Sequence, residues 1–114
     1  MTTKQDVENF LREFKVKMKI RDVVFRDERG KNLQALADLE LRPIDRIRIL
    51  ESLKSSNYSE GPLKERLYCG SNMWIFGKEV KGNEIYIKIT LGLIGASPIC
   101  ISFHIAENVI HYPF

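Results

Sequence analysis

The chain lacks most features of secreted, metal-stabilised or membrane-spanning proteins. Its only cysteines, Cys69 and Cys100, are too few for a disulfide framework and form no Cys-x-x-Cys motif or close Cys–His pair. Neither a metal site nor a cofactor is therefore expected. No apolar run exceeds a few residues, so no segment is expected to span a bilayer. The start, Met1 to Thr3, leads into a polar helix rather than a signal peptide, which predicts a cytoplasmic location.

A strong excess of charge is also absent. The chain has 18 Lys and Arg residues against 15 Asp and Glu residues, a net charge of +3. This bias is too small for a protein that coats nucleic acid. Eight of the cations lie between Arg12 and Lys31, where there are four acids. The stretch is either a flank that attracts phosphates or a solvated helix face followed by an edge strand.

What is present is enough apolar material for one core. Apolar residues make up 44% of the 114 residues, which predicts a single domain over 1–114 with a two-layer architecture. Residues 58–72 show no clear period and predict a loop. Three strands are expected after it, over 73–80, 84–90 and 99–105. The fold class is therefore α+β, with helices packed on one face of a small curved antiparallel sheet.

The N-terminal half has the spacing of amphipathic helices. Thr3 and Asp6 resemble a capping box at the start of the first helix. An edge strand or extended stretch is expected within 16–26, where basic and apolar residues alternate. Asn32 is expected to cap a second helix, and Pro43 to occupy the first turn of a third. The expected apolar positions are Val7, Phe10, Leu11 and Phe14 in the first helix, Leu33, Leu36 and Ala37 in the second, and Ile44, Ile47 and Leu50 in the third.

The last two strands each have one apolar and one polar face. Isoleucine occupies every second position of 84–90, and the alternate positions include Tyr86 and Lys88. The strand over 99–105 repeats the pattern, with Cys100, Ser102 and His104 on its polar side. Pairing of these strands would bring Tyr86, Lys88, Ser102 and His104 together on one open sheet face. Such a face suits a phosphate-bearing ligand.

The hairpin before them leaves two alternatives. A two-residue turn at 82–83 places Trp74, Phe76 and Lys78 on the apolar face, whereas a three-residue loop places them on the polar face. We favour the three-residue loop, because a lysine is costly on a core face. In that register Trp74 or Phe76 can also stack on a nucleobase.

Several segments, in their order, resemble one known family. The segments are WIFGK at 74–78, EIYIKI at 84–89, CISFHIAE at 100–107 and YPF at 112–114. The chain is similar over most of its length to the MqsR family, the messenger-RNA-cleaving toxins of type II toxin–antitoxin operons. The resemblance implies a microbial-RNase fold like that of RelE, endoribonuclease activity on mRNA, and inhibition by a cognate antitoxin, which would be a small zinc-binding or helix-turn-helix protein.

The resemblance also implies individual roles. The active-site tyrosine and following lysine of the family match Tyr86 and Lys88. His104 stands where the best-known branch has a lysine, and Ile75 stands where it has a glutamine after the tryptophan. A lysine of the preceding loop has a counterpart in Lys64.

Metal-free RNA cleavage needs three functions, and three residues are predicted to be catalytic. A base must take the proton of the ribose 2′-hydroxyl, a cation must stabilise the phosphorane, and an acid must protonate the leaving 5′-oxygen. His104 can be base or acid, Lys88 can hold the phosphoryl oxygens, and Tyr86 can donate to the phosphate or position the ribose. The residues predicted to bind RNA are Lys64, Arg66, Trp74, Lys78 and Ser102.

Each of these residues also has a purely structural interpretation, as packing or solvated side chains. The modest charge and the replaced family residues also allow an alternative function, a non-catalytic RNA- or protein-binding module of the same fold.

Overall fold

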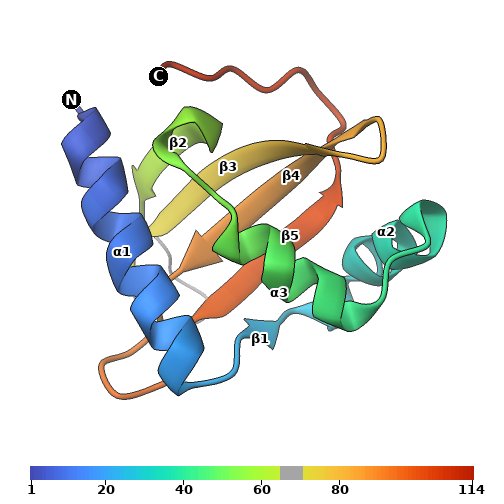
Figure 1. Ribbon diagram of the computed structural model, residues 1–114, viewed down its shortest axis with the longest axis horizontal. Helices are drawn as coiled ribbons and strands as arrows, with labels where there is room; N and C mark the ends of the chain where they lie inside the picture. Colours follow the sequence, from blue (N-terminus) through green and yellow to red (C-terminus); the bar gives the residue numbers. More distant parts are fainter. Residues whose placement is uncertain (65–70) are drawn as a thin grey trace.

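The sheet has five strands in the part of the chain that the computed structural model describes, residues 1–64 and 71–114. Their order is β1-β5-β4-β3-β2 (Figure 1). The three expected strands, β3, β4 and β5, are antiparallel, and β2 adds a fourth antiparallel strand. Strand β1 pairs in parallel with β5, so the sheet is mixed and not antiparallel throughout. The elements are α1 (Lys4–Ile20), β1 (Val24–Phe25), η1 (Asp27–Arg29), α2 (Lys31–Leu39), α3 (Pro43–Glu51), η2 (Ser55–Asn57), β2 (Tyr58–Leu63), β3 (Met73–Val80), β4 (Asn83–Thr90) and β5 (Ile99–Ile105).

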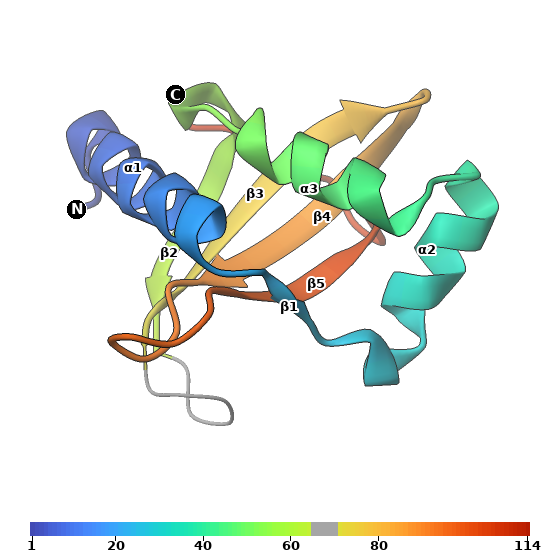
Figure 2. The same ribbon diagram turned by 60° about the horizontal axis from the view of Figure 1, so that its bottom comes forward.

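Helices α1 and α3 cover one face of the sheet, and α2 lies beside β5 (Figures 1 and 2). The α+β class is thereby confirmed. The Thr3–Asp6 capping box is present, with the Asp6 amide donating to Thr3 Oγ1 and the Thr3 amide to the Asp6 carboxylate. All four apolar residues expected on α1 are buried in the same core as the isoleucines of β4. No helix of the described residues is long and apolar enough to cross a membrane.

Helix α1 is longer than expected, because residues 16–20 are helical and not extended. The alternation of lysine and apolar residues also fits a helix here, since Met18 lies four residues after Phe14 and packs against the same core. The intervening lysines hold neighbouring segments: Lys15 donates to the Leu53 carbonyl at 2.6 Å and Lys17 to the Leu91 carbonyl at 2.6 Å.

The expected loop over 58–72 is also wrong at its start, where β2 pairs with β3. Tyr58 anchors this strand, because its ring packs edge-on against Phe76 at 6.1 Å and near Trp74 at 6.2 Å. Pro62 is compatible with a strand here because β2 lies at the edge of the sheet.

The buried positions of α2 and α3 differ from the apolar positions expected from the sequence. Leu33 and Ile44 are about half exposed, whereas Asn32 and Arg46 are buried. Arg46 donates to both carboxylate oxygens of Asp27, at 2.7 and 3.2 Å, and its guanidinium lies 3.8 Å from the centre of the Phe25 ring. Pro43 and Leu50 are placed as expected, in the first turn and in the core.

Asn32 is inside α2 and not its cap, and it binds the backbone of β5. Its Nδ2 donates to the carbonyls of Ile101 (3.1 Å) and Arg26 (3.0 Å), and its Oδ1 accepts from the Phe103 amide at 2.9 Å. Because β1 pairs only with Ile99 and Cys100, this side chain satisfies β5 backbone groups beyond the reach of β1.

The hairpin has a two-residue turn, at 81–82, so the three-residue loop that we favoured is wrong. Val80 pairs with Asn83, and this register puts Trp74, Phe76 and Lys78 on the helix-covered face. Lys78 is only half-buried there, because its long aliphatic stem lets the amine reach solvent.

The charge of Lys78 also acts on helix α1. Burial and the nearby charges of Lys54 and Lys78 lower the pKa of Lys15.

Replacing Asn32 with Ala should lower the free energy of unfolding by about 2–4 kcal/mol, because it leaves buried backbone donors and acceptors without partners. Urea denaturation measures the change. Gln34→Ala, on the exposed side of the same helix, should change it by about 0.5 kcal/mol or less. Equal losses in the two variants would contradict the role of Asn32.

Candidate functional site

The structure brings Tyr86, Lys88, Ser102 and His104 together on the sheet face opposite α1 and α3. Tyr86 of β4 pairs directly with His104 of β5, and Lys88 pairs with Ser102. Their neighbours in the chain, the isoleucines of β4 and Phe103, point into the core. The two-residue period of the sequence is therefore sufficient to predict this cluster.

A hollow of about 500 Å³ opens over these four side chains. Ile75 of β3 and Ser59 and Glu60 of β2 continue its lining across the sheet. Residues 31–32 of α2 and 107–111 after β5 complete its rim. Among residues 1–64 and 71–114, no group of three or more His, Cys, Asp or Glu side chains is arranged to hold a metal ion.

Direct contacts couple three side chains in the hollow. The rings of Tyr86 and His104 stack with centroids 5.2 Å apart and an angle of 22° between their planes. Lys88 Nζ lies 5.8 Å from the centre of the Tyr86 ring. His104 Nδ1 lies 3.0 Å from the Ile105 carbonyl, which can only accept, so this nitrogen carries a proton and Nε2 is the one that can exchange.

The charges around the hollow have two effects on its titrating groups. Burial raises the pKa of Tyr86, and the negative charge of Glu60 raises it further. Tyr86 is therefore a neutral hydrogen-bond donor near neutral pH. At the rim Lys31 donates to Glu107 at 2.8 Å, and this hydrogen bond lowers the pKa of the Glu107 carboxyl.

Two of the predicted RNA-binding residues lie on the opposite face. Trp74 stacks on Phe10 with ring centroids 4.6 Å apart and a 14° angle, so it belongs to the core and not to the hollow. Lys78 lies on the same face as Trp74, because the two residues are four positions apart in β3 and pair with isoleucines of β4. Lys64 is exposed just after β2 and does not line the hollow, and Arg66 lies outside the described residues.

Cys100 was expected on the polar face but is fully buried in the core. The reason is a register shift in β5: Lys88 pairs with Ser102 but the next residue, Ile89, pairs with Cys100. This bulge turns the thiol toward the core, where burial raises its pKa.

The contribution of Glu60 could not be predicted from the sequence, because its segment shows no period and is expected to be a loop. Its position depends on the pairing of β2 with β3, which only the structure reveals.

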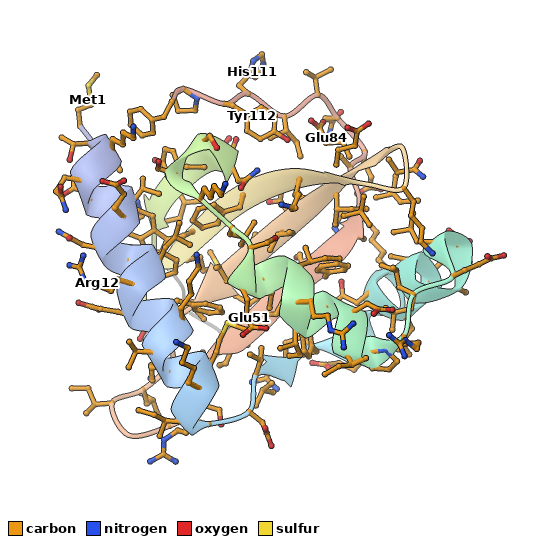
Figure 3. The ribbon with its side chains drawn as sticks, in the orientation of Figure 1. Met1, Arg12, Glu51, Glu84, His111 and Tyr112 are labelled. Atoms are coloured by element: carbon orange, nitrogen blue, oxygen red, sulfur yellow. The ribbon has the colours of Figure 1, made fainter. Side chains whose placement is uncertain are left out.

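The C-terminal segment packs on the same sheet face as the hollow. The Tyr112 hydroxyl donates to the Glu84 carboxylate at 2.7 Å, and Tyr112 and Ile110 fill the space above Gly77. Tyr112 points toward the strands in Figure 3.

No protein-family model matches this chain, and comparisons with curated proteins and with solved structures found no match.

A Gly77→Ala substitution should loosen the C-terminal segment, because the added methyl group collides with the Tyr112 hydroxyl and Ile110. We expect faster hydrogen exchange in residues 109–114 and a loss of about 1–3 kcal/mol in unfolding free energy. In a Tyr112→Ala background the same substitution should cost much less. Unchanged exchange in the single variant would show that the segment does not depend on this packing.

Proposed function

We propose that this protein is an endoribonuclease that cleaves mRNA without a metal ion, the toxin of a type II toxin–antitoxin system. The observation that carries the proposal is the cluster of Tyr86, Lys88 and His104 over one hollow of an open sheet face. The resemblance of these segments to the MqsR family supports it. A RelE-like fold, a cytoplasmic site of action on mRNA and neutralisation by a cognate antitoxin are parts of the same proposal.

The proposed reaction is an internal transesterification. The ribose 2′-oxygen loses its proton and attacks the adjacent phosphorus, and the bond from phosphorus to the 5′-oxygen of the next nucleotide breaks. The leaving oxygen takes up a proton. The products are a 2′,3′-cyclic phosphate and a 5′-hydroxyl end.

The side chains in the hollow match the needs of this reaction. Lys88 supplies a positive charge for the phosphoryl oxygens as negative charge develops on them. Tyr86, kept neutral by its raised pKa, can donate a hydrogen bond to the phosphate or the ribose. His104 has one nitrogen fixed by the Ile105 carbonyl and the other available for proton transfer.

Purified protein should cleave RNA in excess EDTA and leave 2′,3′-cyclic phosphate ends, because every step is assigned to side chains and the 2′-hydroxyl. End analysis of the fragments by mass spectrometry measures this. The His104→Ala variant, purified in parallel, controls for contaminating nucleases. Activity that EDTA abolishes and a divalent ion restores would contradict the mechanism.

Substitutions on the two sheet faces should have different effects. His104→Ala should lower the cleavage rate by roughly 100-fold to 10,000-fold with little change in RNA affinity. Lys88→Ala should reduce both rate and affinity and weaken the salt dependence of binding, because a phosphate contact is lost. Lys78→Ala is the matched control, since it removes a β-strand lysine from the helix-covered face.

These variants should be compared in single-turnover cleavage and in binding titrations at several salt concentrations. A folded His104→Ala variant with the parental rate would remove His104 from the mechanism. Wild-type protein that binds RNA but never cleaves it would favour the non-catalytic binding module instead.

A further inference from the structure

A bulge in β2 turns Glu60 toward the hollow. Tyr58 pairs with Phe76, but Glu60, two residues later, pairs with Ile75, only one residue further along β3. In a regular strand Tyr58 and Glu60 would share a face. The extra residue places Tyr58 in the core and Glu60 in the lining of the hollow.

Glu60 is an exposed carboxylate that lines the hollow from the edge strand. Its side chain forms no hydrogen bond or ion pair with the described residues. Its charge nevertheless acts across the hollow, since it contributes to the raised pKa of Tyr86. By contrast, Glu107 at the rim forms an ion pair with Lys31, and Asp27 forms an ion pair with the buried Arg46.

The sheet places Glu60 and His104 on opposite sides of Lys88. The row Glu60, Ile75, Lys88 and Ser102 runs across four strands, and His104 follows Ser102 on the same face of β5. Three strand spacings, about 14 Å, separate the backbones of β2 and β5. This separation leaves room for one phosphodiester over Lys88, between the two side chains.

We propose that Glu60 is the general base of the ribonuclease reaction and His104 its general acid, with the scissile phosphate held between them over Lys88. This assignment rests on the proposed function and extends it, because it gives each proton transfer its own residue. In-line displacement requires the attacking and leaving oxygens on opposite sides of phosphorus, so a base and an acid on opposite sides of the hollow suit it.

The step balances with these groups alone. The Glu60 carboxylate takes the 2′-hydroxyl proton as the 2′-oxygen bonds to phosphorus. The bond from phosphorus to the 5′-oxygen breaks, and protonated His104 gives its proton to that oxygen. Glu60 ends protonated and His104 neutral, and exchange with water resets both.

The test uses Glu60→Gln, which keeps the shape of the side chain and removes its ability to accept a proton. Single-turnover cleavage of RNA should fall by roughly 100-fold to 10,000-fold, while RNA affinity should stay equal or rise because a negative charge is lost. The control is Glu51→Gln, which removes the same charge from α3 on the helix side (Figure 3) and should cleave at the parental rate.

A second substrate separates base from acid. An RNA with sulfur in place of the 5′-oxygen at the mapped cleavage site has a leaving group that departs as a thiolate without a proton. On this substrate His104→Ala should recover most of its activity, whereas Glu60→Gln should remain as impaired as on normal RNA. A reversed pattern would exchange the two roles and overturn the assignment.

The pH profile gives an independent measurement. The pH–rate profile of normal RNA should fall on both its acidic and its basic side, as expected for a reaction that uses one base and one acid. The low-pH fall should vanish in Glu60→Gln, and the high-pH fall should vanish with the thiolate substrate. The other titrating groups that line the hollow are Lys31, Tyr86, Lys88, Glu107 and His111.

The outcomes distinguish the two levels of the proposal. If wild-type protein cleaves RNA and Glu60→Gln cleaves it at the same rate with the same pH profile, the role of Glu60 is wrong and the ribonuclease stands. If wild-type protein cleaves neither substrate, the proposed function itself is wrong and the assignment falls with it.

Discussion

The two-residue turn at Lys81 and Gly82 determines which face of the sheet becomes core and which carries the hollow. Both residues have positive φ, 51° and 81°, the conformation of the tight turns that match the twist of a hairpin. The Lys81 amine also donates to the carbonyls of Leu39 (2.9 Å) and Glu40 (3.2 Å) at the end of α2. The turn is therefore fixed by its backbone and by a neighbouring helix. A change of one residue in the pairing would move Trp74 and Phe76 out of the core.

The features that could be predicted from the sequence are those encoded by local period. The isoleucines of β4 and the apolar positions of α1 recur at regular spacing, so the core face, the polar face and their four clustered side chains follow directly. The hairpin register could not be obtained this way. The desolvation argument against Lys78 assumed a buried amine, but the flexible stem carries the amine to the margin of the core.

The remaining errors arise where a polar side chain serves a neighbouring segment. Asn32 and Arg46 occupy inward positions because a strand backbone and a carboxylate require them, and Leu33 and Ile44 then face outward. Two bulges likewise break the alternation of β2 and β5. The bulge in β5 places Cys100 on the core face instead of the polar face, and the bulge in β2 places Glu60 on the polar face. Such bulges depend on the pairing of distant segments, which no local pattern contains.

The irregular course of β2 also affects how the molecule meets other chains. This strand ends the sheet, and an unpaired strand at that position normally invites another strand to add to it. Here Pro62 lacks an amide donor, and the neighbouring Gly61 carbonyl already accepts from the Thr2 hydroxyl at 2.6 Å. Together with the bulge, these features remove the regular row of donors and acceptors that an incoming strand would need. Association through this end of the sheet must therefore use side chains rather than a shared backbone ladder.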